Sequence, residues 1–166
     1  MKAVFKKARR KDLSKIVAIY NETIASRMVT ADLEAVSVAS RQAWFEAHGE
    51  KMPLWLIIAD TKVVGWVGLD AFYGRKAYQR TAEISIYIDA DYHYKGLGQQ
   101  AIDFVIEQLK TLQIDTLLAF IFGHNQPSLN LFAKNGFEHW GHLPKVALMD
   151  DKRRDLEIMG RNFLKI

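Results

Sequence analysis

Polar and apolar positions alternate clearly between Thr81 and Ala90, which is typical of a β-strand with one buried face. Successive side chains of a strand point to opposite faces of its sheet. Three isoleucines should therefore face one side and the polar side chains the other: Ile84, Ile86 and Ile88 against Glu83, Ser85, Tyr87 and Asp89.

Other segments give a coarse outline of the chain. Leu13, Ile16, Val17 and Tyr20 follow a possible N-cap at Asp12 with helical spacing. Helices are predicted near residues 12–25, 98–112 and 125–135, with a shorter one after Ser37. Strands are predicted near residues 2–8, 54–59, 63–72, 81–90, 116–122, 137–147 and 154–164. Single strands and hairpins around one βαβ-like centre predict an α+β or mixed α/β fold.

The composition is that of an ordinary globular protein. The chain has 166 residues, 49% of them hydrophobic, and a net charge of 23 − 19 = +4. We expect one domain over residues 1–166, since no Pro-rich linker divides the sequence. There are no cysteines, so disulfides and thiolate chemistry are excluded and a reducing cytoplasm is favoured. No apolar run reaches the ~20 residues that span a bilayer, and the charged N-terminus does not look like a signal peptide.

The segment from Glu83 to Gln99, EISIYIDADYHYKGLGQ, carries the strongest functional signal. A strand enters a short loop, and the loop enters a helix at Gly96-Leu97-Gly98. The first N–H groups of a helix have no intrahelical acceptor and lie at the positive end of its dipole. The sequence therefore predicts a phosphate-binding site, and a pyrophosphate-containing cofactor.

Three alternatives compete for this loop. The first, a P-loop, lacks its pattern GxxxxGK[ST] here. The second is a Rossmann fingerprint, which Gly96-x-Gly98-x-x-Ala101 fits with Asp115 as the acidic partner, but Asp115 begins the next strand rather than ending it. The third and simplest is a turn that only joins a strand to a helix.

A second motif favours a different cofactor-binding loop over these alternatives. His93-Tyr94-Lys95-Gly96-Leu97-Gly98 resembles the acetyl-CoA loop Gln/Arg-x-x-Gly-x-Gly/Ala of the GNAT N-acetyltransferases, with His93 as a departure. Residues 125–137, NQPSLNLFAKNGF, resemble the same family's pattern NxxSxxL[YFH]xxxGF. The two motifs occur in the family's order, with one helix and one strand between them.

Further segments look like the phosphinothricin and methionine sulfoximine acetyltransferase branch, and the similarity runs from about residue 3 to 163. They include Ile19-Tyr20-Asn21-Glu22, Thr81-x-Glu83-x-Ser85-x-Tyr87 and Gly141-His142-Leu143-Pro144. The resemblance implies a GNAT fold with a twisted, mostly antiparallel sheet flanked by helices. It also implies acetyl-CoA as donor, a primary amine on a small amino-acid-like molecule as acceptor, and a homodimer.

The resemblance also suggests which residues bind the cofactor. Main-chain amides from Tyr94 to Gln99 should hold the pyrophosphate; this set is Tyr94, Lys95, Gly96, Leu97, Gly98 and Gln99. Ile86, Tyr87 and Ile88 should pair with the pantetheine arm like an added strand. Asn125 and Ser128 should approach the same arm, although Asn125 also suits a plain N-cap, and Lys95 also suits a solvated surface position.

Glu83 is the candidate catalytic residue, because the acceptor amine must lose a proton and a carboxylate of raised pKa accepts it. The alternative for Glu83 is a structural salt bridge or hydrogen bond at the start of the strand. Phe132 occupies the cofactor-contacting position where many GNAT enzymes have a tyrosine that protonates the leaving thiolate, and it cannot do so. A CoA-binding sensor or interaction module with little turnover is therefore the rival hypothesis.

The acceptor site is predicted in the loop of residues 72–80, which contains Tyr73, Arg75, Tyr78 and Arg80. Arginine suits a carboxylate, whereas the alternative is a set of surface arginines beside core aromatics. No metal is expected, since the five histidines, including His139 and His142, lack a metal-binding spacing. The basic run of residues 6–11 has no nucleic-acid-binding motif beside it, so no nucleic-acid partner is predicted.

Overall fold

The computed structural model describes residues 1–164, and all of its strands belong to one seven-stranded sheet. The strand order is β1-β2-β3-β4-β5-β7-β6, and the only parallel pair among the described strands is β4 with β5. The strands are β1 (Val4–Lys7), β2 (Leu54–Ala59), β3 (Lys62–Ala71), β4 (Thr81–Ile88), β5 (Thr116–Phe122), β6 (Glu138–Met149) and β7 (Lys152–Asn162). The predicted mixed, mostly antiparallel sheet is confirmed.

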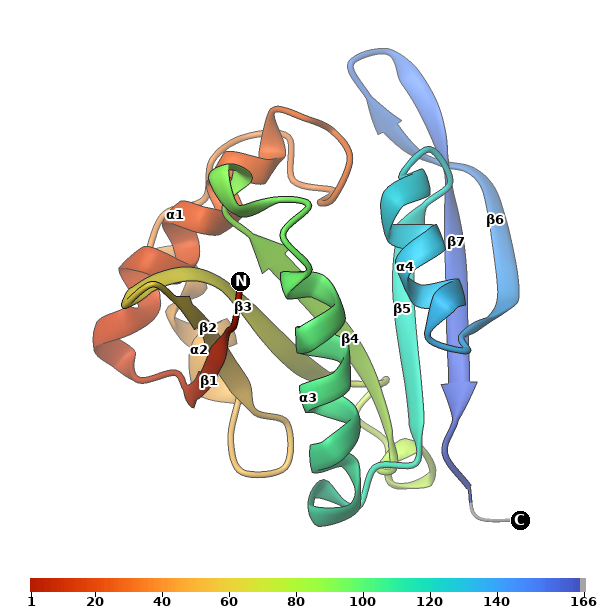
Figure 1. Ribbon diagram of the computed structural model, residues 1–166. Helices are drawn as coiled ribbons and strands as arrows, with labels where there is room; N and C mark the ends of the chain where they lie inside the picture. Colours follow the sequence, from red (N-terminus) through yellow and green to blue (C-terminus); the bar gives the residue numbers. More distant parts are fainter. Residues whose placement is uncertain (165–166) are drawn as a thin grey trace.

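Four α-helices flank the sheet (Figure 1): α1 (Leu13–Ile24), α2 (Gln42–Ala47), α3 (Leu97–Leu112) and α4 (Gln126–Lys134). Short 3-10 turns occur at Arg10–Asp12, Ala39–Arg41, Lys76–Tyr78 and Ala90–Tyr92. The predicted helices and strands are all present, with ends shifted by a few residues. No helix of residues 1–164 has the length and apolar character needed to cross a bilayer.

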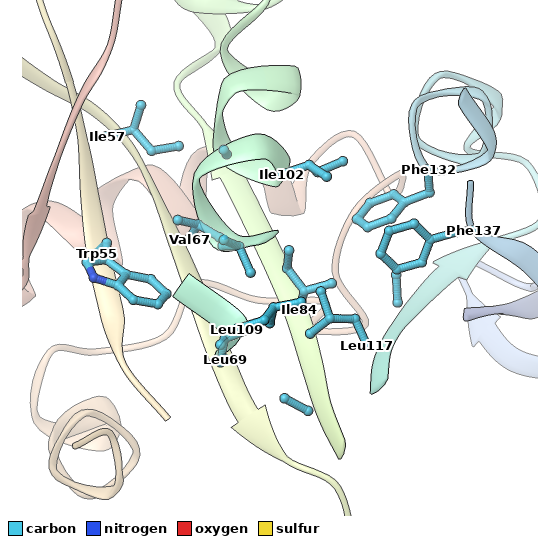
Figure 2. Close-up of a cluster of buried hydrophobic side chains, with 14 of the residues drawn as sticks. Trp55, Ile57, Val67, Leu69, Ile84, Ile102, Leu109, Leu117, Phe132 and Phe137 are labelled. Carbon is cyan, nitrogen blue, oxygen red and sulfur yellow. The ribbon is translucent and has the colours of Figure 1, made fainter. Parts of the chain in front are cut away.

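The alternation in β4 gives the two faces of the sheet different partners. Ile84 packs under α3 with Ala101 and Ile102, in a core that also receives Phe132 of α4. Figure 2 shows this cluster, in which Ile102 and Leu109 of α3 lie among side chains of the strands and of α4. The opposite face carries Trp66 and Tyr87, which pack with α1 and α2. The predicted division of β4 into an isoleucine face and a polar face is therefore confirmed.

Ile102 fixes α3 against the sheet, because its side chain is fully buried in this cluster. Ile102→Ala is expected to lower the free energy of unfolding by about 2–5 kcal/mol, through lost burial and a residual cavity. Denaturant titration measures this change. Val4→Ala, at a 52% exposed position on β1, should cost less than about 1 kcal/mol; similar losses for both variants would contradict this assignment of the core.

Candidate active site

The loop after β4 is shaped by local hydrogen bonds. The Asp89 carboxylate accepts from the Asp91 N–H at 3.0 Å, and His93 Nε2 lies 2.8 Å from the Ile88 carbonyl oxygen. Tyr94 and Gly96 both have positive φ, at 59° and 77°. Alternating signs of φ turn successive N–H groups toward one side of a loop, which is how backbone anion sites form.

Helix α3 begins directly after this turn, at Leu97. The first hydrogen bond of the helix runs from the Gln100 N–H to the Gly96 carbonyl at 3.2 Å, so the preceding N–H groups have no intrahelical acceptor. Gly98 permits close packing here, since a Cβ at this position would lie 2.9 Å from Leu131 Cδ2. The helix therefore presents free N–H donors and its positive dipole end at Gly96.

A cavity of about 560 Å³ opens at this helix end, between β4, α3 and α4. It contains most of the residues that the sequence predicts to bind the cofactor: Ile86, Tyr87, Ile88, Tyr94, Gly96, Leu97, Gly98, Gln99, Asn125 and Ser128. Lys95 is not part of its lining. The Lys95 ammonium instead donates to the Asp91 carbonyl at 2.7 Å and lies 4.6 Å from the centre of the Tyr92 ring.

The cavity wall opposite the loop comes from the C-terminal end of α1 and the segment that follows it. Thr23, Ser26, Met28 and Val29 lie there, and none of them was predicted. Asn125 ties this wall to α4: its Nδ2 donates to the Met28 carbonyl at 2.9 Å, and its Oδ1 accepts from the Ser128 N–H at 3.2 Å. The N-cap role of Asn125 is thus confirmed, and its contact with a cofactor stays a prediction.

The cavity continues into a gap between β4 and β5. These strands pair only at their first residues, with Thr81, Ala82 and Glu83 opposite Thr116, Leu117 and Leu118. Beyond that point they diverge, as Figure 1 shows toward the end of β4 that leads into the loop before α3. A gap of about 60 Å³ follows, lined by residues 84–87 and 119–122. Phe132 lies at this gap, where it packs edge-on against Phe137 at 4.9 Å.

Glu83 is the last residue of β4 that pairs with β5, so it lies where the gap begins. Burial, together with the nearby negative charge of Asp70, raises the pKa of its carboxyl to about 6. Asp70 is the register partner of Glu83 on β3, and side chains of directly opposite residues share one face of a sheet. Among the described residues Glu83 forms no ion pair, so a structural salt bridge is not supported.

A second cavity, of about 160 Å³, lies on the α1 and α2 side of the sheet. Its walls include Tyr20, Arg41, Trp44, Trp66, Asp70, Ser85 and Tyr87. It shares Ser85 and Tyr87 with the gap between β4 and β5. Arg41 is bound by the Asp32 carboxylate, which also accepts from the Tyr20 hydroxyl. Cavities thus border β4 on both faces of the sheet.

The predicted acceptor residues lie away from this second cavity. Arg75 and Tyr78 line a separate hollow of about 280 Å³ beside Phe72, and Tyr73 is 77% exposed. Arg80 donates to the Asp115 carboxylate at 2.5 Å. Asp115 precedes β5, so it lies at the opposite end of the parallel strands from the phosphate loop. It therefore cannot serve as the acidic partner of a Rossmann site.

One histidine cluster was not anticipated by the spacing. His139 Nε2 lies 2.5 Å from Glu157 Oε2, and His142 Nδ1 lies 2.8 Å from Glu157 Oε1. Asp155 lies next to them, with its carboxylate 3.8 Å from His142 Nε2. A register shift in the pairing of β6 with β7 between His139 and Gly141 accompanies this arrangement. These side chains pair with one another on β6 and β7.

Comparison with known proteins places this geometry in a family. The model of the acetyltransferase (GNAT) family matches residues 16–137. A Bacillus subtilis protein named "Putative phosphinothricin acetyltransferase YwnH" is 50% identical over 93% of this chain and 95% of its own length. An L-methionine sulfoximine/L-methionine sulfone acetyltransferase of Pseudomonas paraeruginosa is 30% identical over 98% of this chain and 95% of its own length.

A solved structure agrees with these relatives. A GNAT superfamily phosphinothricin acetyltransferase from Sinorhizobium meliloti, crystallised in complex with acetyl-CoA, superposes with a TM-score of 0.91 at 25% identity, over 98% of this chain and 89% of that one. The free amides at Gly96, the open edge of β4 and the family match lead to one conclusion: this chain belongs to the GNAT family of acetyltransferases and has the GNAT fold.

Proposed function

We propose that this enzyme transfers the acetyl group of acetyl-CoA to the primary amine of a small, amino-acid-like acceptor of the phosphinothricin or methionine sulfoximine type. The observation that carries the proposal is the continuous path from the α3 N-terminus, along the open edge of β4, to Ile84, the residue next to Glu83. The test is thiol release from acetyl-CoA with a panel of amino acids and amines. Thermal stabilisation by acetyl-CoA without thiol release would instead favour the CoA-binding sensor.

The residues around the path match the parts of the cosubstrate. Helix α3 offers N–H donors for a pyrophosphate. The backbone of residues 84–88 is paired with β3 on one side only, so its other edge is available for the amide groups of a pantetheine arm, like an added strand. Acetyl-CoA supplies the thioester, and an N–H of the same open edge is positioned to stabilise the oxyanion that forms at its carbonyl.

Glu83 acts as the general base in this proposal. The acceptor amine arrives largely protonated, and its nitrogen attacks only after a proton has left. A carboxyl with a pKa of about 6 is ionised at neutral pH and is a stronger base than an ordinary glutamate. Phe132 cannot protonate the departing thiolate. The thiolate can leave without such an acid, because the anion of a thiol with a pKa of ~8.5 is a fair leaving group.

Glu83→Gln is expected to lower kcat by about 100-fold or more, in the range of general-base catalysis. The dissociation constant of acetyl-CoA, measured by calorimetry, should change by less than about 2-fold, since Glu83 does not line the cofactor cavity. In the unaltered enzyme kcat/KM should rise as pH increases through about 6, because only ionised Glu83 accepts a proton. An unchanged rate in the variant would remove Glu83 as the base.

Gly96→Val should weaken acetyl-CoA binding by at least about 10-fold, because a β-branched residue at φ 77° strains the turn that aims the N–H donors. Gly74→Val is a matched control. Gly74 also has positive φ, 61°, and open space at its Cβ position, but it lies outside the cofactor cavity. Equal affinities for the two variants, measured by calorimetry, would contradict the placement of the pyrophosphate.

The proposal includes a homodimer and a location in the cytoplasm, which suits a cysteine-free chain. The edge strand β6 exposes four large apolar side chains: Trp140, Leu143, Val146 and Leu148 are 39–55% exposed. Such a group on an edge strand marks an interaction surface, and a second copy of the chain is the occupant that the family resemblance implies.

Val146→Asp is expected to shift the dimer toward monomer, because it places a charge in the apolar surface of β6. Light scattering coupled to size-exclusion chromatography measures the molar mass. Val4→Asp, equally exposed on the opposite edge strand β1, should leave the dimer intact. A monomeric unaltered protein at micromolar concentration would contradict the dimer.

A further inference from the structure

Two carboxylates lie side by side next to the gap between β4 and β5. Asp70 of β3 and Glu83 of β4 are directly opposite each other in register, so their side chains are neighbours on one face of the sheet. Burial raises the pKa of both carboxyls, which shows that each is partly removed from water. Adjacent like charges in such a place are unfavourable unless a cation lies near them.

The described residues supply little positive charge to this pair. No lysine or arginine of residues 1–164 forms an ion pair with Asp70 or Glu83. Arg41 lines the same cavity as Asp70, but its guanidinium is bound to Asp32. The remaining titratable groups around this face are the phenols of Tyr20 and Tyr87 and the imidazole of His48.

Among residues 1–164, His48 is the only basic side chain that pairs with Asp70. Its Nε2 lies 3.5 Å from Asp70 Oδ1, and its side chain is only 5% exposed. The Nδ1 atom lies 3.0 Å from the Trp44 carbonyl oxygen, which only accepts, so Nδ1 carries a hydrogen. The Nε2 atom is buried and makes no hydrogen bond within residues 1–164. Burial keeps the pKa of Asp70 raised and outweighs the imidazole of His48 and a hydrogen bond from the Trp44 side chain, which both lower that pKa. A carboxylate can still accept several more hydrogen bonds.

The cavity beside Asp70 is the right kind of space for a small amine. It is about 160 Å³, it shares Ser85 and Tyr87 with the gap that leads to the cofactor cavity, and four of its nine lining residues are aromatic. Asp70 faces this cavity, and its register partner Glu83 is the proposed base. An ammonium group at this place would contact negative charge on both strands, with the rest of the acceptor against the aromatic walls.

We infer that Asp70 is a second carboxylate of the acceptor site: it binds the protonated amine beside Glu83, in the cavity on the α1 and α2 side of the sheet. The inference rests on the proposed function and makes it more specific. The acceptor is recognised as an alkylammonium ion. Glu83 takes one of its protons, the neutral nitrogen then attacks the thioester carbonyl, and the C–S bond breaks to give the amide and the thiolate. The nitrogen then loses a second proton. Of the two protons lost from the ammonium, one protonates the thiolate and the other is released to solvent.

Asp70→Asn keeps the size of the side chain and removes its charge. We expect KM for the acceptor to rise by about 10-fold to 100-fold, whereas KM for acetyl-CoA and kcat at pH 8 change by less than about 3-fold. The acceptor is the amine that gives the fastest thiol release, with methionine sulfoximine tested first. The rise of kcat/KM with pH should also move to lower pH, since the Asp70 charge that opposes ionisation of Glu83 is gone.

Two comparisons separate ammonium binding from a structural effect. Asp60→Asn removes a carboxylate from the β2–β3 turn and should leave every parameter unchanged. Methoxyamine is mostly uncharged at neutral pH, so Asp70→Asn should raise its KM much less than that of an alkylamine. Thermal melting checks that both variants are folded.

An acceptor KM within about 2-fold of that of the unaltered enzyme would overturn the role of Asp70 while leaving the proposed function intact. An equal rise of KM for methoxyamine and for the alkylamine would also overturn it. Absence of thiol release with every amine, in the unaltered enzyme, would contradict the proposed function itself.

Discussion

The divergence of β4 from β5 is the constraint on which the site depends. The two strands are parallel neighbours for three residue pairs and then separate, so the backbone of residues 84–88 has a hydrogen-bonded partner only in β3. Unpaired N–H and C=O groups inside a protein are costly. In the proposed complex, the amide groups of the cosubstrate satisfy them. Cavities border β4 on both sides of this open edge.

The two faces of β4 have different roles: one packs in the core, and the other borders the proposed active site. The isoleucine face packs under α3, and this packing fixes the N-terminus of the helix at the end of the strand. The polar face carries Glu83, Ser85 and Tyr87 toward α1 and α2, where the second cavity lies. Because the side-chain period of a strand is two, a slip of one residue would exchange these faces and lose both functions. Core packing and catalysis therefore depend on the same register.

Much of this arrangement follows from local sequence, because it depends on local rules. The alternation in Thr81–Ile88 predicts the two faces, and the strand–loop–helix order around Gly96 predicts the anion site. The cavity wall at Thr23–Val29 could not be predicted, since contacts between segments about 100 residues apart, such as Asn125 with Met28, leave no periodic signal. Asp70 was missed for a similar reason: only the β3–β4 register places it beside Glu83.

The loop of residues 72–80, predicted from the sequence to bind the acceptor, lies apart from the cavity that the structure forms beside Asp70. Arg75 and Tyr78 border a hollow that shares no residue with the cavity at Asp70, and Arg80 is neutralised by Asp115. The sequence prediction rested on the loop's tyrosines and on arginines that suit a carboxylate, but the acceptor nitrogen must come within reach of both the base and the thioester. The second cavity meets that requirement through its shared boundary with the gap at Ser85 and Tyr87.

The same geometry explains why Phe132 is compatible with catalysis. Its ring is 6% exposed and packs against Phe137, so it serves the core at the edge of the gap rather than proton transfer. The Tyr78 hydroxyl lies in the separate hollow and does not take the place of the missing acid. The barrier must then be lowered at the nucleophile and at the oxyanion, through Glu83 and the open β4 edge, because the thiolate leaves without protonation at a small energetic cost. In the proposed mechanism the demanding proton transfer is the one from the incoming ammonium, and Asp70 and Glu83 are the carboxylates that serve this step.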